Sequence, residues 1–391
     1  MTEKIRVMIV DESVVYRQFL SEALSSVAGM EVVTVAATGK IALARLAQNP
    51  VDLLLFDVEM KTGDALGALK EIRATYPEVG LVLLSGLDSN SAGTAIQALE
   101  MGALELLAKP NPSGSGESLA EFRGRLESMV RAYRGKKHAR LAKRLTEGKS
   151  AKELLTKVRA EQAAGPAVSR KKGAGQAALV EWHRPARIDV IAVAVSTGGP
   201  KALGEVIPQL PGDLGVPVLL VQHMPPLFTE ALAGSLNKKS QLEVSEAKAG
   251  ERVRPNRVYI APGGKHMVVE PDPEADNEGL AVRIALSLDP PVNSCRPAAD
   301  VLFRSIAEVY GGHTLAVIMT GMGNDGAQGV REMKIKGCYC LSQSEESCVV
   351  YGMPRAVDEA GLADEQVGLG QLAGRMSALV KRIRDGRNHD A

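Results

Sequence analysis

The chain is poor in aromatic residues, which make up 3% of its 391 residues and include a single Trp. So few rings argue against a surface that binds nucleobases or sugars by stacking. The formal net charge of +1 at pH 7 gives no overall attraction to nucleic acid or to an anionic membrane. We therefore expect partners other than nucleic acid.

Long apolar runs are also missing, and none approaches the roughly 20 residues needed to span a bilayer. The first residues, MTEKIRVMIV, lack the apolar core and cleavage site of a secretory signal and fit a first β-strand. The four Cys residues show neither paired CxxC spacing nor a His at ligand spacing (Cys295, Cys338, Cys340, Cys348). We expect reduced thiols in a cytoplasmic protein without membrane insertion.

Short apolar stretches alternate with helical spacing over roughly the first 125 residues. Five stretches are apolar enough for buried parallel strands: Ile5–Val10, Val32–Ala36, Leu53–Phe56, Leu81–Leu84 and Leu104–Leu107. Helical spacing separates them at Ser13–Val27, Gly39–Gln48, Asp64–Thr75 and Ser91–Met101. These repeats predict a doubly wound α/β domain.

The alternation resumes at Ile188. Strands are expected at Ile188–Val195, Val216–Val221, Val258–Ile260, Val282–Leu286, Leu315–Met319 and Cys338–Leu341. Helices are expected at Lys201–Gln209, Phe228–Leu236, Ala298–Val309, Ala327–Ile335 and Gln371–Ile383, with a hairpin-like insertion near Ala261–Leu286. We predict two parallel-sheet α/β domains, residues 1–125 and 188–391, with a long linker at 126–187.

This linker is first basic and then rich in Gly and Ala. Its composition predicts a solvated helix followed by a flexible segment. A tether for nucleic acid or an acidic partner is the alternative, but the basic stretch lacks the interleaved aromatic side chains that would support it.

Three acidic residues follow two strands of the first predicted sheet. Asp11 and Glu12 close the first strand and Asp57 closes the third. In the strand order 2-1-3-4-5 these strands are neighbours, so the carboxylates would converge on one crevice. A hard cation such as Mg²⁺ would relieve their repulsion. The alternative is that each is an ordinary loop acid.

Two further polar residues end the next strands. Ser85 follows the fourth strand and could hydrogen-bond a phosphoryl oxygen, and Lys109 follows the fifth and supplies a positive charge. With a metal ion neutralising phosphoryl charge, Asp57 could act as a nucleophile toward phosphorus.

The stretches VDES, LLLFDVEM, LLSG and LLAKP resemble the motifs of two-component receiver domains. The resemblance implies Asp57 as the phospho-acceptor, a Mg²⁺ site at Asp11, Glu12 and Asp57, and Ser85 with Lys109 as the switch pair. Glu12 stands where Asp is more usual, and Leu106 where the family often has an aromatic switch residue.

A second constellation lies at strand ends of the C-terminal half. Ser196 ends one predicted strand, His223 ends the next, and Asp325 lies in TGMGNDG after a third. Such positions would present a nucleophile, a base and an orienting carboxylate to one crevice. The Met322 N–H is a candidate donor to the oxyanion.

The same glycine-rich stretch permits another interpretation. Gly321–Gly326 is formally G-x-G-x-x-G, and Glu345 and Glu346 follow about 20 residues later, as in a dinucleotide-binding fold. Against it, Asp325 would face the pyrophosphate, and Ser196 and His223 would have no role.

The stretches VSTGGP, QHMPPLFTEAL, VYIAPGGKHM, RPAADVLFRSIA, IMTGMGNDGAQG and SQSEESCVVYGMPRAV resemble the chemotaxis protein-glutamate methylesterases, the CheB family. The resemblance implies a Ser196, His223, Asp325 triad with Thr197 beside the nucleophile. It also implies phosphorylation-activated hydrolysis of glutamate methyl esters on methyl-accepting chemotaxis receptors, with receptor glutamine deamidation in many members. A chemotaxis histidine kinase would be the phosphodonor, and a regulator that only binds partners is the alternative.

Overall fold

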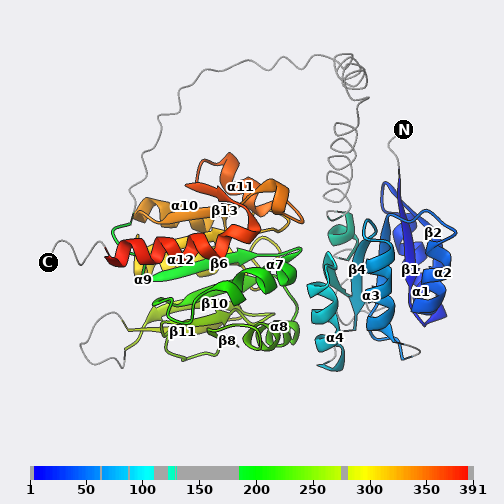
Figure 1. Ribbon diagram of the computed structural model, residues 1–391, viewed down its shortest axis with the longest axis horizontal. Coiled ribbons are helices and arrows are strands. Elements are labelled where there is room, and N and C mark those ends of the chain that lie inside the picture. Colours follow the sequence, from blue (N-terminus) through cyan, green and yellow to red (C-terminus); the bar gives the residue numbers. More distant parts are fainter. Residues whose placement is uncertain are drawn as a thin grey trace, which may run out of the picture.

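The computed structural model describes residues 4–61, 64–86, 89–109, 122–127, 129, 185–273 and 281–385. These residues form two α/β domains that lie side by side (Figure 1). The predicted fold class is confirmed, because each domain is built on a parallel sheet. The predicted linker at 126–187 lies almost entirely outside the described residues, and the exact domain boundaries stay predictions.

The N-terminal domain contains a five-stranded parallel sheet in the predicted order β2-β1-β3-β4-β5. Its strands are β1 (Ile5–Val10), β2 (Met30–Ala36), β3 (Leu53–Asp57), β4 (Gly80–Ser85) and β5 (Glu105–Ala108). Every residue of β3 and β4 is buried. Helices on both faces explain why these strands read as continuous apolar runs.

Each of the first three helices begins after a polar residue that caps it. The helices of this domain are α1 (Val14–Ser25), α2 (Gly39–Leu46), α3 (Ala65–Thr75) and α4 (Ser89–Glu100). Ser13, Thr38 and Asp64 accept hydrogen bonds from backbone N–H groups in the first turns of α1, α2 and α3. These caps satisfy donors that the helix itself leaves unpaired, so the helix starts were readable from the sequence.

The C-terminal domain contains a seven-stranded parallel sheet in the order β14-β13-β12-β6-β7-β9-β8. Its strands are β6 (Val190–Val195), β7 (Val218–Gln222), β8 (Glu243–Glu246), β9 (Arg257–Ile260), β12 (Thr314–Ile318), β13 (Tyr339–Gln343) and β14 (Glu365–Val367). The sequence did not predict the edge strands β8 and β14, because they are short and partly exposed and carry few apolar residues.

The expected hairpin insertion is a separate antiparallel pair, β10 (His266–Pro271) with β11 (Val282–Ser287). The helices of the domain are α7 (Gly199–Val206), α8 (Phe228–Asn237), α9 (Ala299–Tyr310), α10 (Ala327–Lys336), α11 (Met353–Glu359) and α12 (Leu369–Asp385). The sequence analysis missed α11. Pro354 argued against a helix there, because Pro breaks helix interiors. In the first turn, however, the N–H that Pro lacks would have no partner within the helix, so Pro is tolerated.

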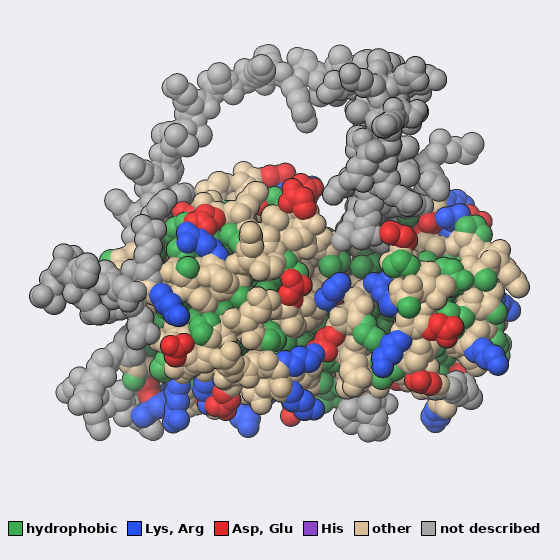
Figure 2. All heavy atoms as spheres, in the orientation of Figure 1, with side chains coloured by type: hydrophobic (Ala, Val, Ile, Leu, Met, Phe, Trp, Pro, Cys, Tyr) green, Lys and Arg blue, Asp and Glu red, His purple; other side chains and the backbone are tan. Residues whose placement is uncertain are grey.

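The visible surface carries charges of both signs, with Lys and Arg side chains interspersed among Asp and Glu (Figure 2). This distribution agrees with the near-zero net charge of the sequence. Among the residues that the structure describes, no helix is both long and apolar enough to cross a membrane.

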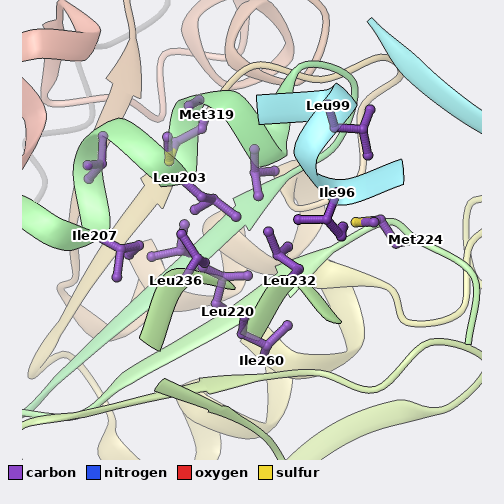
Figure 3. Packing of buried hydrophobic residues seen from close by; sticks show 14 of the residues in the cluster. Ile96, Leu99, Leu203, Ile207, Leu220, Met224, Leu232, Leu236, Ile260 and Met319 are labelled. Carbon is purple, nitrogen blue, oxygen red and sulfur yellow. The ribbon is translucent and has the colours of Figure 1, made fainter. Parts of the chain in front are cut away.

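The two domains share one hydrophobic core through α4, which packs against α7 and α8. Ile96 of α4 lies beside Met224 and Leu232 of the C-terminal domain (Figure 3). At the end of α4, the Glu100 carboxylate accepts hydrogen bonds from Ser235 Oγ and Lys239 Nζ, both at 2.6 Å. The contact therefore has a buried apolar centre and a polar edge.

Candidate active site and phosphorylation site

Ser196 and His223 follow neighbouring strands in register. Val195 at the end of β6 pairs with Gln222 at the end of β7, so the next residue of each strand lies at the same edge of the sheet. The His223 N–H donates to Val195 O at 3.2 Å, and the Ser196 N–H donates to Thr320 O, just past β12, at 3.0 Å. The strand ends therefore converge as the sequence predicted.

His223 contacts Asp325 directly, with Nε2 lying 2.7 Å from Oδ2. The carboxylate is 2% exposed and also accepts hydrogen bonds from Asn293 Nδ2 at 2.8 Å and from the Ala299 N–H at 2.6 Å. A buried carboxylate at this turn would repel a pyrophosphate, and its contacts with His223 and Asn293 give it a different role. This geometry disfavours the dinucleotide interpretation.

The His223–Asp325 contact perturbs both groups. Burial alone would lower the pKa of the His223 imidazole, but the hydrogen bond to Asp325 and the nearby Cys295 thiol raise that pKa to about 10. Burial would raise the pKa of Asp325, but the hydrogen bond to His223 and the surrounding donors hold it below its usual value. The pair therefore stabilises an imidazolium beside a carboxylate, the state that follows proton transfer from a nucleophile.

The third contact of a triad is not formed here. Ser196 is 8% exposed, and within the described part of the chain no hydrogen bond joins its Oγ to the His223 ring. Because Nε2 is engaged by Asp325, Nδ1 is the ring nitrogen left to receive the hydroxyl proton. In structures without substrate, such a contact is often loose.

The loop that begins at Gly321 packs directly against Ser196. A Cβ at Gly321 would lie 2.8 Å from the Ser196 Cβ and 2.4 Å from the Met353 Sδ, so only glycine permits this approach. The adjoining Met322 N–H donates to no described acceptor. It remains the candidate oxyanion donor.

Two buried polar side chains that the sequence analysis missed hold the loop that carries Ser196. Gln222 Nε2 donates to Ser196 O at 3.1 Å and to His223 O at 3.2 Å. Thr320 Oγ1 donates to Thr197 O and accepts from the N–H groups of Val349 and Val350, each at 3.0 Å. Their positions in the sequence could have revealed them, because Gln222 ends β7 and Thr320 lies just past β12.

The N-terminal domain contacts the residues that directly follow Ser196. Thr197 Oγ1 donates a hydrogen bond to the Glu105 carboxylate, and the Gly198 N–H donates to Leu104 O at 3.0 Å. Burial raises the pKa of Glu105, opposed by Arg125, by the Thr197 hydroxyl and by His223. Thr197, predicted as active-site support, is therefore engaged by the other domain.

At the edge of the first sheet, Lys109 joins two of the predicted acidic residues. Its Nζ lies 2.7 Å from Asp57 Oδ2 and 3.0 Å from Asp11 Oδ2. Both carboxylates are almost fully buried. Burial raises the pKa of Asp57, and the hydrogen bond and charge of Lys109 oppose that rise.

Two other predicted residues of this site have different partners. Ser85 Oγ donates to Glu59 Oε1 at 2.7 Å, and the Gly86 N–H donates to the same oxygen at 2.6 Å. Glu12 Oε2 accepts from the Lys61 N–H at 2.9 Å. Glu59, which the sequence analysis did not single out, therefore holds the predicted switch hydroxyl.

The acidic residues Asp11, Glu12 and Asp57 carry the carboxylate oxygens that a divalent metal ion binds. In the described part of the chain, no three acidic, His or Cys side chains are already arranged as a metal-binding group. Asp11 Oδ2 and Asp57 Oδ2 are both buried and lie 3.0 and 2.7 Å from the same Lys109 ammonium, so this edge of the sheet already pairs the two carboxylates with a cation. Carboxylate oxygens of this kind are the ligands that Mg²⁺ prefers.

Comparisons with known proteins match both halves of the chain. Residues 7–117 match the response regulator receiver domain, and residues 191–376 match the CheB methylesterase domain. The crystal structure of the Thermotoga maritima CheB methylesterase catalytic domain is 40% identical in sequence, covers 49% of this chain and 99% of its own, and has a TM-score of 0.47.

Two relatives match nearly the whole chain. A protein-glutamate methylesterase/protein-glutamine glutaminase of Desulfotalea psychrophila is 39% identical, over 97% of this chain and 99% of the relative. One of Trichodesmium erythraeum is 36% identical, over 97% of this chain and 99% of the relative. The chain therefore belongs to the CheB family of protein-glutamate methylesterases/protein-glutamine glutaminases, with a receiver domain followed by a methylesterase domain.

Proposed function

We propose that this chain hydrolyses glutamate methyl esters on methyl-accepting chemotaxis receptors, releases methanol, and is activated by phosphorylation of Asp57. The observation that carries the proposal is the 2.7 Å contact between His223 and Asp325 beside Ser196 at adjoining strand ends. We also assign receptor glutamine deamidation to the same site, because both reactions begin with attack on an acyl carbon.

In this mechanism Ser196 Oγ attacks the carbonyl carbon of the ester, and its proton passes to His223 Nδ1. Asp325 stabilises the resulting imidazolium through Nε2. The Met322 N–H donates to the oxygen that becomes negative. Collapse of the tetrahedral intermediate breaks the bond to methoxide, which leaves as methanol with the proton from His223.

The second half of the reaction restores the enzyme. A water molecule attacks the acyl carbon bound to Ser196 Oγ while His223 takes its proton. The bond to Oγ then breaks, glutamate is released, and the proton returns to Ser196. With glutamine as the substrate the leaving group is ammonia, and the remaining steps are the same.

The contact between the domains supports regulation by occlusion. The start of β5 contacts Thr197 and Gly198, and α4 packs on α7 and α8, so the receiver domain lies against the loop that carries Ser196. Phosphorylation adds roughly two negative charges beside Lys109, which directly follows β5. We propose that this change weakens the docking of β5 and α4 and opens the site to a receptor.

Asp11, Glu12 and Asp57 would hold the Mg²⁺ that receiver phosphorylation uses, with Lys109 and Ser85 as the switch pair. The ion would supply positive charge to the phosphoryl oxygens. A chemotaxis histidine kinase is the proposed phosphodonor, and the cytoplasm, where kinase and receptor signalling domains meet, is the proposed location.

The test is methanol release from methylated receptor membranes. Wild type is expected to release methanol faster when a small phosphodonor and Mg²⁺ are added, whereas Asp57→Asn keeps the basal rate. Ser196→Ala is expected to release none while it still accepts phosphate on Asp57. Methanol release by Ser196→Ala would refute the hydrolase mechanism, and unchanged release after phosphorylation would refute the regulation.

A further inference from the structure

A second carboxylate lies next to Asp325, and the two cap each other's helices. Asp325, which precedes α10, accepts from the N–H groups of Ala299 and Asp300 in the first turn of α9, at 2.6 and 3.2 Å. Asp300, on α9, accepts from the Gly329 N–H in the first turn of α10 at 2.7 Å. Negative charge is favourable at both helix N-termini.

One amide joins these two carboxylates. Asn293 Nδ2 donates to Asp300 Oδ2 and to Asp325 Oδ1, both at 2.8 Å. A primary amide nitrogen carries two hydrogens, so both bonds can exist together. The carboxylates are 5% and 2% exposed, and their mutual repulsion is therefore screened mainly by groups of the protein.

The backbone that presents this amide is held in an uncommon conformation. Asn293 and Ser294 have φ of 52° and 60°, and their neighbours Val292 and Cys295 exchange backbone hydrogen bonds at 3.1 and 2.9 Å. Asn tolerates the left-handed region better than most residues. Strain of this kind persists where surrounding contacts or function require it.

We infer that Asn293 is a positioning residue, whose amide bridges Asp300 to Asp325 and so fixes the orientation in which Asp325 faces His223. The inference rests on the proposed function and deepens it, because it assigns control of the catalytic imidazole to residues outside the triad. Asn293 acts through Asp325, because its amide donates to Asp300 and Asp325.

The charges around this pair determine what the loss of the amide should do. Asp325 faces His223 and Asp300, whereas His223 faces Asp325, the Cys295 thiol and, from the receiver domain, Glu105. Without the amide, Asp325 can turn away from the His223 ring, so the contact that raises the pKa of the imidazole weakens. The acid limb of the rate profile should therefore move to lower pH.

The kinetic test compares two adjacent glycine substitutions in the full-length chain. Asn293→Gly removes the amide but suits a left-handed backbone, and Ser294→Gly makes the same change where no side-chain hydrogen bond is described. With the phosphodonor present, we expect kcat of Asn293→Gly to fall by about 10- to 100-fold, the loss typical of removing a group that orients an active-site ligand. KM and the values for Ser294→Gly should stay near those of wild type.

A second measurement does not depend on activity. Titration of ¹⁵N-labelled histidine by NMR, with the His223 signal assigned from His223→Gln, reports the pKa and tautomer of the ring. We expect the His223 pKa to fall in Asn293→Gly, because the contact with Asp325 is no longer held, and to remain unchanged in Ser294→Gly. An unchanged His223 titration in Asn293→Gly would overturn the inference, even if kcat and thermal stability both fell.

The two measurements keep the inference separate from the proposed function. If wild type releases no methanol, the proposed function fails, and the NMR titration still decides the role of Asn293. If wild type hydrolyses the ester and Asn293→Gly does so with the same kcat and pH profile, only the positioning role fails.

Discussion

The Thr197 hydroxyl, adjacent to Ser196, donates a hydrogen bond to the Glu105 carboxylate of the receiver domain. Glu105 begins β5, and Lys109, which contacts Asp57 at 2.7 Å, directly follows that strand. One short strand thus joins the proposed phosphorylation site to the loop that carries Ser196, the proposed nucleophile. This connection gives a physical basis for coupling the two sites.

Replacing Glu105 should loosen the docked state. Glu105→Ala removes the acceptor for Thr197 Oγ1, and we expect methanol release without phosphodonor to increase by about 10- to 100-fold, because a charge-assisted hydrogen bond contributes about 1.5–3 kcal/mol. Release with phosphodonor should change little. Glu308→Ala, an exposed substitution on α9, is the control. A basal rate equal to that of wild type would show that the Glu105 contact does not restrain the enzyme.

The pH dependence of hydrolysis follows from His223. Hydrolysis needs the neutral imidazole, and the contact with Asp325 raises its pKa from 6.5 to about 10. The rate of the phosphorylated enzyme should therefore keep rising above pH 7, when kcat is measured from pH 5 to 10. A rate that levels off with a midpoint at or below pH 6.5 would contradict this assignment.

The same shift predicts a change in stability. The pKa of His223 is higher in the folded state than in the unfolded state. The stability that the His223–Asp325 contact adds to the fold is therefore fully present below about pH 6.5 and is lost as the pH rises through about 10. The difference in unfolding free energy between wild type and His223→Gln should shrink across that interval. A difference that grew with pH would have the wrong sign.

Glu59 should restrain the receiver switch. Its Oε1 accepts from both Ser85 Oγ and the Gly86 N–H, and a phosphoryl group on Asp57 would need the Ser85 hydroxyl. We expect Glu59→Ala to release more methanol than wild type when the same fraction of each protein is phosphorylated. That fraction is measured on a phosphate-affinity gel. Glu71→Ala, exposed on α3, is the matched control. Equal or lower activity in Glu59→Ala would exclude this restraint.

Close packing at Gly321 should make the active site sensitive to one methyl group. In Gly321→Ala the new Cβ would meet Met353 and Ser196, so we expect hydrolysis to fall by at least about 100-fold with phosphorylation of Asp57 unaffected. Gly204→Ala is the control, because its Cβ would meet nothing within 4 Å and Ala favours a helix over Gly. Near-normal hydrolysis by Gly321→Ala would place the nucleophile elsewhere.

Local sequence patterns were enough to predict both sheets and the strand ends that carry the candidate sites. Buried parallel strands read as apolar runs, and the polar residues that follow them, such as Asp57 and His223, must lie at one edge of the sheet. The edge strands β8 and β14 escaped prediction because partial exposure leaves no such run.

The sequence by itself thus determined the two folds and the residues that end their strands, because burial and hydrogen bonding along each strand act locally. Only the tertiary structure decided which ring nitrogen of His223 faces Asp325, that Ser85 is held by Glu59, and that Thr197 meets Glu105. The last two residues are 92 positions apart. Such contacts depend on how separately formed elements pack together, and no local periodicity records that packing.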